Sequence, residues 1–375
     1  MANYQPQREA AMFERPSACV LAILLFLGAA PSGTQPGDTA PPGPAAPTAF
    51  SQSQRAAVLD GAEKAVGDYT FADKVPALRA TLAAHRTAYL AVDDPTAFAA
   101  AVNADLYAVA HDKHLRIKYS ALAAPMYGSE QHGASLAHLM QSQQILNYGY
   151  AAAIRLAGNV GYLRMDEFGP MPQSKVAIDA AMAFLARTDA LIIDVRANHG
   201  GDPDSLDYLM GYFYAKPVEL TSILITQGGK RQLYKQFSEA RVGGARYLAR
   251  PLFVLTSDHT FSCAEQFSYD MQALRRATLI GQTTGGGANP GGFVPLDPHF
   301  AIFIPLGRAV NPYTKTNWEG VGVVPDVATE SGAALLKAYT QALGTAGNAF
   351  DETAAARAEA LKDPAKALAA SLPSI

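Results

Sequence analysis

The spacing of apolar positions divides the chain into a helical first part and a mixed later part. Up to residue 110, apolar residues recur at helical spacing, which predicts three short helices. The expected helices are residues 54–66, 74–91 and 97–110. The break at Asp94-Pro95-Thr96 separates the last two, and Thr96 is expected to cap the third. We therefore predict an N-terminal helical subdomain at residues 50–112.

After residue 112 short apolar or alternating runs, typical of strands, alternate with helical patterns. The expected strands are 115–119, 159–165, 190–196, 219–227, 251–256 and 277–281, the expected helices are 176–185, 204–214 and 264–274, and a hairpin is expected around Leu296-Asp297-Pro298. Residues 121–158 show no regular pattern. Strands alternating with helices predict an α/β core with a mainly parallel sheet. We place this core at residues 113–330 and an alanine-rich helical tail at 331–375.

The first residues have the pattern of an export signal. Arg8 and Arg15 precede an apolar run at 18–27, and small residues follow it, which is typical of a secretory signal peptide. We assign residues 1–30 to the signal peptide and the Pro/Gly-rich residues 31–49 to a linker. The run is short for a bilayer span, so no stable membrane span is expected after signal removal, and a retained anchor is the alternative. Met12 is an alternative start. The protein is expected to be exported, to the periplasm or outside the cell.

Composition narrows the class of protein further. Of the 375 residues, 49% are hydrophobic, and the net charge of −3 comes without a basic block, so we expect no nucleic-acid partner. The two cysteines are Cys19 and Cys263. Only Cys263 remains after signal removal, so no internal disulfide can form. This composition fits an exported enzyme that relies on its core for stability.

The segment most suggestive of chemistry is TSDHTFSCAE, residues 256–265. It joins an expected buried strand to an expected helix, and Ser262 lies at the junction. A serine there can present its hydroxyl in the open, while the helix N-terminus offers N–H groups to a developing oxyanion. With a base nearby, this arrangement makes serine a nucleophile for acyl transfer.

Three further segments carry candidate residues, and each also has an ordinary structural interpretation. Gly200 and Gly201 in DVRANHGGD can form an oxyanion site or simply a tight turn. In HDKH, both His111 and His114 are candidates for a base, and spacing alone does not decide between them. Either can instead be a histidine without a catalytic role. Glu319, in NWEGVGVVPD, can orient a base or be a solvated carboxylate.

Other chemistries have little support in the sequence. The loop GQTTGGG at 281–287 lacks the spacing of a phosphate-binding loop. His111 and His114 are three apart with no third ligand of the usual kind nearby, and no other set has metal-ligand spacing. We therefore expect no cofactor and no metal.

Taken in order, these segments resemble the S41 family of serine peptidases. The segments that carry the resemblance are DKHL, DVRANHGG, TFSCAEQF, GQTTGG and EGVGVVPD, within residues 50–330. The branch it resembles is the tricorn and interphotoreceptor retinoid-binding protein type. The resemblance implies a ClpP/crotonase-like α/β core and a peptide or protein substrate.

The resemblance also implies residue roles. Ser262 would be the nucleophile, His114 the base and Glu319 the carboxylate that orients the base. The oxyanion hole would come from Gly200, Gly201 and Cys263. Hydrolysis would then pass through an acyl-enzyme intermediate.

The second large branch of the family, the C-terminal processing peptidases, uses a serine–lysine dyad. Its lysine belongs in the glycine-rich loop, and the loop here, GQTTGGGANPGG, contains no lysine. The segment 120–158 is also too short for the PDZ domain usual in that branch. Two departures from the tricorn type remain: Lys113 stands where glycine is frequent, and no second serine adjoins His114.

Two other functions stay open at the level of sequence. The first is a family member with weak or lost catalysis that binds hydrophobic ligands or peptides. The second is a non-peptide acyl hydrolase or a hydratase, since the core also resembles the crotonase type. The sequence does not indicate the oligomeric state.

Overall fold

The computed structural model describes residues 50–121, 141–227, 230–345 and 351–372. The predicted signal peptide and linker, residues 1–49, lie outside these ranges. Among the helices that are described, none is long and apolar enough to cross a membrane.

A six-stranded sheet forms the centre of the molecule, with strand order β12-β8-β7-β4-β3-β2. Its strands are β2 (Tyr150–Leu156), β3 (Val160–Met165), β4 (Ala190–Asp194), β7 (Leu252–Thr256), β8 (Thr278–Gly281) and β12 (Val327–Ala328). All neighbours pair in parallel except β2 and β3, which are antiparallel. Strands β4 and β7 are buried along their whole length, as expected for the middle of a parallel sheet. The predicted α/β class with a mainly parallel sheet is confirmed.

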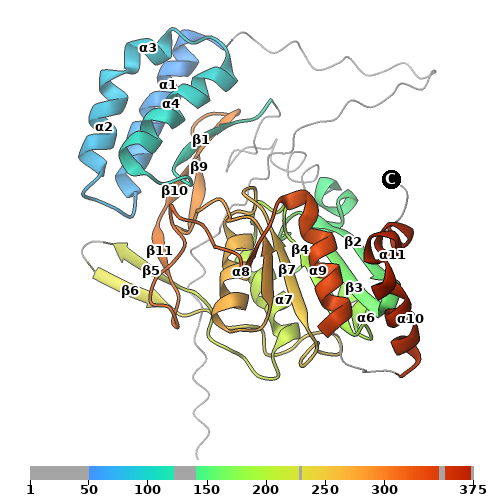
Figure 1. Ribbon diagram of the computed structural model, residues 1–375. Helices are drawn as coiled ribbons and strands as arrows, with labels where there is room; N and C mark the ends of the chain where they lie inside the picture. The colour runs from blue at the N-terminus through green and yellow to red at the C-terminus, as the bar shows by residue number, and fades with distance from the viewer. Residues whose placement is uncertain (1–49, 122–140, 228–229, 346–350, 373–375) are drawn as a thin grey trace, which may run out of the picture.

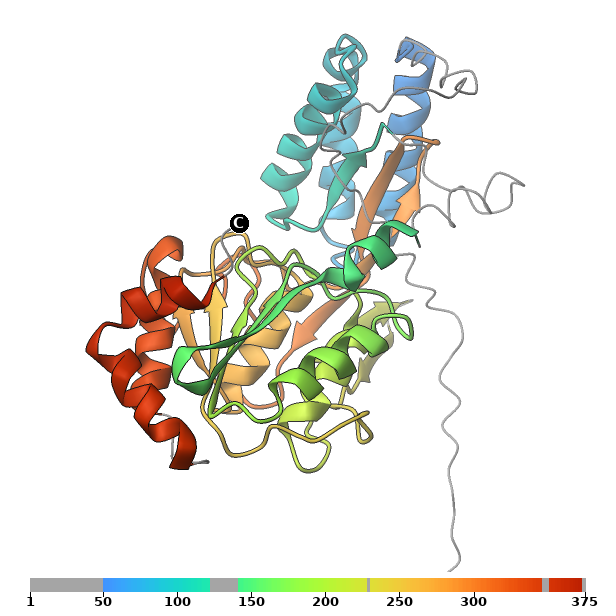
Figure 2. The same ribbon diagram turned by 90° about the vertical axis from the view of Figure 1, so that its right-hand side faces the viewer.

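Helices cover both faces of this sheet (Figures 1 and 2). One face packs against α6 (Lys175–Leu185), α7 (Pro203–Met210) and α8 (Cys263–Ala273). The other packs against α9 (Ser331–Thr345), α10 (Asp351–Lys362) and α11 (Pro364–Ser371). The side chains of Ala334, Ala338 and Tyr339 on α9 are fully buried against strands β4, β7 and β8. The alanine-rich tail is therefore one layer of the core.

Four helices precede the sheet: α1 (Gln52–Ala65), α2 (Val75–Ala84), α3 (Arg86–Leu90) and α4 (Pro95–Ala110). The single helix expected at 74–91 is interrupted at His85, whose φ and ψ of −96° and 3° are not helical. The expected cap at Thr96 is wrong. Asp94 caps α4 instead, because its carboxylate accepts the Ala97 N–H at 2.6 Å.

The helical subdomain shares its core with strands that come much later in the chain. An antiparallel sheet with order β1-β10-β9 lies against the helices (Figure 1) and contains β1 (Arg116–Tyr119), β9 (Gly291–Pro295) and β10 (Phe300–Pro305). The hairpin expected around residue 297 joins β9 to β10. Phe300, Ile302 and Ile304 of β10 are buried in the same cluster as the helices. Residues 50–112 therefore do not close a core by themselves.

A third, antiparallel sheet has the order β11-β5-β6 and contains β5 (Ser222–Gln227), β6 (Lys230–Tyr234) and β11 (Gly307–Val310). The sequence analysis did not predict β2, β6 or β11. Segment β2 reads YAAAIRL, in which only the end residues Tyr150 and Leu156 are buried, so the strand has no alternation of apolar and polar positions. Strand β6 is largely exposed and β11 has only four residues, so neither has an apolar run to reveal it.

Candidate active site

Ser262 lies between β7 and α8, at the N-terminus of the helix, and its backbone is strained. Its φ of 56° and ψ of −122° fall in a region that residues other than glycine rarely adopt, at a cost of about 1–3 kcal/mol. Two hydrogen bonds hold the turn: the Phe261 N–H donates to the Asn198 carbonyl at 3.0 Å, and the Ser262 N–H to the Glu265 carboxylate at 2.9 Å. The surrounding structure thus fixes the serine hydroxyl at the sheet's carboxyl edge.

Glu265 joins this turn to the glycine-rich loop. Besides the Ser262 N–H, its carboxylate accepts the Thr284 hydroxyl at 2.5 Å and the N–H groups of Gly286 and Gly287 at 2.6 and 2.8 Å. The side chain is fully buried, and both oxygens are used. We did not assign it a role from sequence. The sequence does contain a signal for this role of Glu265, namely the S-x-x-E spacing of a capping box from Ser262 to Glu265.

His114 meets Ser262 across the cleft. Its Nε2 lies 3.0 Å from Ser262 Oγ, a hydrogen-bonding distance, and its ring packs between those of Phe261 and Phe303 with centroids 4.7 and 5.2 Å away. The rival candidate, His111, is exposed, caps α4 in a left-handed conformation and packs edge-on against Tyr107. Of the two histidines, only His114 is near the serine.

Asp112, which the sequence analysis did not single out, fixes the backbone of His114. Its Oδ1 accepts the His114 N–H at 2.9 Å. Its Oδ2 accepts the Tyr69 hydroxyl at 3.0 Å and the Asn289 side-chain amide at 2.9 Å. Because Tyr69 belongs to the helical subdomain and Asn289 to the core, Asp112 links both parts to His114.

Glu319 lies near His114 without a hydrogen bond to it. Its Oε2 accepts the N–H groups of Ala288 and Asn289 at 2.6 and 3.1 Å. Within the described residues, its Oε1 and the Nδ1 of His114 are buried atoms without a partner. One ring nitrogen of His114 and one oxygen each of Glu319 and Asp112 lie within 4.8 Å of one another. Glu319 is therefore a candidate partner for His114 Nδ1, since catalytic hydrogen bonds are often long before substrate binds.

Burial shifts the pKa values of His114, Glu319 and Cys263 in the direction that favours the neutral form of each side chain. Burial, with Arg116 and Lys118 adding to it, lowers the pKa of His114 to about 3. Burial, followed by the charge of Asp112, raises the pKa of Glu319 to about 7. Burial also raises the pKa of the Cys263 thiol to about 12, so this thiol is not a nucleophile at neutral pH.

The two glycines after β4 lie against the serine turn. Gly200 and Gly201 have φ of 104° and 137°. A Cβ on Gly200 would lie 2.7 Å from Ser262 Cβ, and one on Gly201 would lie 2.1 Å from the Phe168 carbonyl oxygen. The Gly200 N–H already donates to Asn198 Oδ1 at 2.8 Å. The Cys263 N–H, in the first turn of α8, has no acceptor within its helix, as at every helix start.

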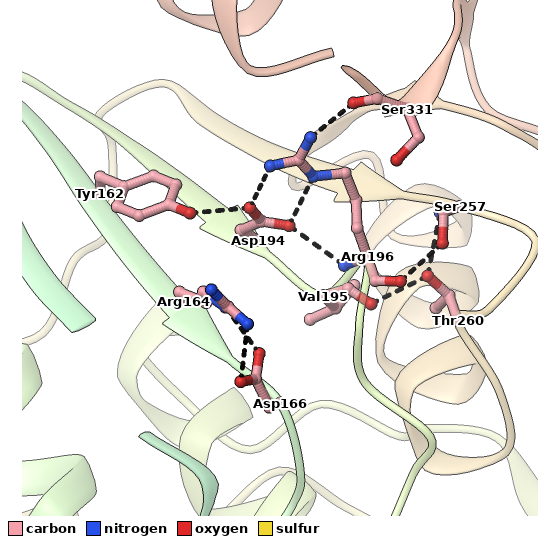
Figure 3. Close-up of polar contacts among 9 residues, drawn as sticks. All are labelled: Tyr162, Arg164, Asp166, Asp194, Val195, Arg196, Ser257, Thr260 and Ser331. Atoms are coloured by element: carbon pink, nitrogen blue, oxygen red, sulfur yellow. Dashed lines mark hydrogen bonds and ion pairs between the residues drawn. The ribbon is translucent and has the colours of Figure 1, made fainter. Parts of the chain in front are cut away.

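Polar contacts around Arg196 fix the loop that carries these glycines (Figure 3). The guanidinium of Arg196 holds Asp194 through Nε at 2.9 Å and Nη2 at 2.6 Å, and also donates to the Ser331 carbonyl of α9. The Ser257 and Thr260 hydroxyls donate to the carbonyls of Arg196 and Val195. The β4 and β7 loops are thereby tied together.

Metal ions in proteins are commonly bound by His, Cys, Asp and Glu side chains. Within the described part of the chain, Asp112, His114 and Glu319 are the only set of three such side chains close enough to share a metal ion. Both oxygens of Asp112 and one of Glu319 already accept hydrogen bonds. The remaining pair, His114 Nδ1 and Glu319 Oε1, is a matched donor and acceptor. Zinc needs at least three protein ligands, so this cluster fits a histidine–carboxylate pair better than a metal centre.

Ser262 and His114 open onto a cavity of about 1190 Å³. It is lined also by Gly200, Gly201 and Cys263, by the loop at 285–288 and by the beginning of β9. The structure thus brings the predicted serine, histidine and glycines to one cleft, with Glu319 adjacent to the histidine.

Comparison with known proteins places this arrangement in a family. Residues 159–329 match the sequence profile of peptidase family S41. Residues 49–150 match that of the N-terminal domain of peptidase S41 in eukaryotic interphotoreceptor retinoid-binding protein.

Individual relatives are distant. A carboxy-terminal-processing protease of Bartonella bacilliformis is 26% identical over 191 residues, which cover 48% of this chain and 41% of the relative, so the chain spans less than half of that relative's length. A lipoprotein of Streptococcus agalactiae superposes with a TM-score of 0.50 at 15% identity, over 79% of this chain and 97% of that one. The tricorn protease gives a TM-score of 0.43 at 14% identity, over 75% of this chain and 35% of that one. The two profile matches together span well over half of the chain, and the protein belongs to peptidase family S41.

Proposed function

We propose that this protein is a serine peptidase that hydrolyses peptide bonds through Ser262, His114 and Glu319. The observation that carries the proposal is the 3.0 Å contact between His114 Nε2 and Ser262 Oγ. It joins a neutral imidazole to a serine held in a strained turn at a helix N-terminus. A nucleophile, a base and a helix N-terminus in one cleft are the components of acyl transfer.

In the proposed reaction, His114 Nε2 takes the proton of Ser262 as Oγ attacks the peptide carbonyl carbon. The ionised Glu319 then stabilises the imidazolium through His114 Nδ1–H. When the tetrahedral intermediate collapses, the C–N bond breaks and His114 returns the proton to the leaving amine. Water, activated by the same histidine, attacks the acyl-enzyme and releases Ser262.

The N–H groups of Gly201 and Cys263 are the proposed oxyanion donors. The N–H of Gly200 is committed to Asn198, so Gly200 contributes space rather than a donor: a side chain there would meet Ser262. This refines the expectation that both glycines donate.

The substrate is proposed to lie extended along β9. In its sheet β9 is an outer strand, Gly291 to Phe293 line the cavity, and a Cβ on Gly292 would meet nothing within 4 Å. The other outer strand, β1, is closed at Ile117, whose N–H and carbonyl both bond the side chain of Asn103. Open strand edges bind peptides through their backbone groups.

Fluorophosphonate labelling and a peptide-library cleavage assay test this function. We expect the probe to modify Ser262, and Ser262→Ala to lower hydrolysis by about 10⁵-fold or more while leaving the fold intact. Ser53→Ala, at an exposed serine of α1, should behave as wild type. A wild-type protein that binds peptides but neither reacts nor hydrolyses would instead be a binding protein of this family.

The protein is further proposed to be exported, with residues 1–30 as the signal. The charged start and the apolar run at 18–27 support this. N-terminal sequencing of the mature protein from the periplasmic and extracellular fractions tests it. A full-length protein in the cytosol would contradict the proposal.

A further inference from the structure

One part of the catalytic cavity is lined by α8 and by the strands β5 and β11, and its walls are largely apolar. Ile223 of β5 and Ala309 of β11 are paired in register, and both line the cavity. The buried indole of Trp318 lines it as well, and its N–H is already donated to the Gly287 carbonyl at 2.8 Å. These three side chains therefore offer a ligand apolar surface and no hydrogen bond. We call this part the side pocket, and its lining residues are Ile223, Ala309, Trp318, Gln236 and Gln266.

Two glutamines form the polar end of the side pocket. Gln266 lies one turn of α8 beyond Ser262, and its Nε2 donates to Gln236 Oε1 at 3.0 Å. The backbone of Gln236 is held in turn, because its carbonyl accepts the Leu220 N–H at 2.9 Å. The two side-chain amides thus form one pair at a fixed place beside the nucleophile.

A buried carboxylate fixes the orientation of this pair. Asp270 is fully buried and accepts the Thr221 hydroxyl at 2.7 Å and the Asn311 amide at 2.9 Å, and the side chain of Gln266 interacts with it as a further donor. The Asp270 carboxylate and Gln236 Oε1 are both acceptors, so the NH₂ group of Gln266 faces them. The Oε1 of Gln266 therefore points away from both.

The pair leaves one donor and one acceptor for a ligand. Among the residues that the structure describes, the Nε2 of Gln236 and the Oε1 of Gln266 have no hydrogen-bond partner. Neither atom is sealed inside the protein, and both residues line the cavity. A carboxamide is the matching group, because its oxygen can accept from Gln236 while its NH₂ group donates to Gln266.

Other side chains fit the pair less well. An apolar side chain displaces water from the two amides without replacing its hydrogen bonds, which leaves both groups unpaired. A carboxylate cannot donate to Gln266 Oε1 and brings a second negative charge close to Asp270. An ammonium group has no acceptor for the N–H of Gln236.

We propose that Gln236 and Gln266 form a specificity subsite for the side chain of glutamine at the residue whose carbonyl Ser262 attacks. This inference rests on the proposed peptidase function and specifies its substrate class. The attacked carbonyl is bonded to the Cα of that residue, so its side chain is the one that starts nearest to Ser262. One helical turn, about 5.4 Å, separates Ser262 from Gln266. The two methylene groups of a glutamine span this distance along the apolar wall and bring the carboxamide to the pair.

The test uses one peptide that the wild type cleaves, in three forms that carry Gln, Met or Glu on the acyl side of the scissile bond. Methionine has nearly the length of glutamine but no amide. We expect kcat/KM for the Gln form to exceed each of the others by about tenfold or more. In Gln266→Met, and separately in Gln236→Met, the ratio of the Gln form to the Met form should fall to about twofold or less. A purely structural loss would instead lower kcat/KM for all three forms alike.

Gln52→Met, at an exposed glutamine of α1, is the matched control and should keep the wild-type preference. Equal kcat/KM for the Gln and Met forms in the wild type, or an undiminished preference in Gln266→Met and Gln236→Met, would overturn the subsite. The same peptides are also titrated against Ser262→Ala by fluorescence anisotropy. If the wild type hydrolyses nothing, the peptidase proposal fails. A tighter binding of the Gln form that is lost in Ser262→Ala/Gln266→Met would still support the subsite, and equal binding of the Gln and Met forms would overturn it.

Discussion

At the scale of single residues, the backbone strain at Ser262 is maintained by the fully buried carboxylate of Glu265. Glu265 accepts four hydrogen bonds, one of them from the Ser262 N–H. The remaining three bind the glycine-rich loop behind the histidine. The position of the hydroxyl is thus set by a buried carboxylate that is fully occupied by donors, which gives it a structural rather than a chemical role.

Glu319, in contrast, has one carboxylate oxygen without a hydrogen-bond partner among the described residues. We predict that this carboxylate controls the pH dependence of kcat/KM. With its pKa raised to about 7, it keeps its proton until the pH passes that value. His114, with its pKa lowered to about 3, stays neutral over this whole range. A protonated Glu319 cannot stabilise the imidazolium, so kcat/KM should rise with pH through about 7. Glu319→Gln should lose this rise together with about 10⁴-fold of activity.

Initial rates between pH 5 and 9 check this, with Glu330→Gln, an exposed acid, as the control. A rise near pH 7 that persists in Glu319→Gln would refute the assignment.

The effect of rising pH on stability is opposite to its effect on activity. The native state retains a proton that the unfolded chain releases from pH 4.5 upward, so Glu319 destabilises the fold as the pH rises to about 7. Glu319→Gln should remove this loss in thermal unfolding.

The sequence indicated the candidate catalytic residues better than the residues that support them. Ser262, His114 and Glu319 lie in segments whose order resembles a known family, whereas Asp112 and Asn198 act through backbone bonds that only the folded chain reveals. Spacing alone did not separate His111 from His114. The separation comes from the left-handed turn at the end of α4, which turns His111 toward solvent.

At the scale of elements, the cleft is built from the loops that follow β4, β7 and β8. Parallel strands end at the same edge, so loops distant in sequence meet there. The hydroxyls of Ser257 and Thr260 bind the carbonyls of the β4 loop, and Thr284 in the β8 loop binds Glu265 of α8. Ser262 and the proposed oxyanion donors are therefore held in one frame.

Gly201→Ala tests that frame. The new Cβ would meet the Phe168 carbonyl oxygen at a φ where alanine is strained, so the loop and its N–H must move. We expect kcat to fall by about 10²–10³-fold, the loss typical of one missing oxyanion donor. Gly332→Ala, where a Cβ meets nothing within 4 Å, serves as the control. Undiminished kcat in Gly201→Ala would exclude this N–H from the site.

Elements with a clear apolar period were predictable, and those defined by pairing were not. The amphipathic α1 and α6 and the buried β4 and β7 stand close to their expected positions. Strand β2 was missed because it is stabilised by its antiparallel partner β3 rather than by a pattern of its own. Pairing between distant segments is set by tertiary structure, which intrinsic propensity does not contain.

At the scale of the whole molecule, the hydroxyl of Tyr69 connects the helices of the N-terminal subdomain to the site. Tyr69 is buried, and its hydroxyl donates to Asp112, which holds the backbone of His114. Subdomain and core are thus joined next to His114 as well as through their shared strands.

Tyr69→Phe should reveal this link. Removing the hydroxyl deprives Asp112 of one donor, which should lower the free energy of unfolding by about 1–3 kcal/mol. It should also lower kcat with little change in KM, because His114 loses support while the β9 edge is unaltered. Steady-state kinetics and chemical denaturation measure both effects. Tyr107→Phe, at an exposed tyrosine of α4, is the matched control, and identical behaviour of the two variants would argue against the link.

The pairing of β1 with β10 has a consequence for the order in which the protein matures. Ile117 pairs with Ile302, and Phe300, Ile302 and Ile304 complete the core beneath the helices. The strand after His114 therefore has no partner until the chain has been synthesised past residue 305. A nascent or truncated chain that ends between residues 262 and 300 contains His114 and Ser262 but lacks the strand that pairs with β1. If the proposed function holds, activity therefore requires a chain that extends past residue 305.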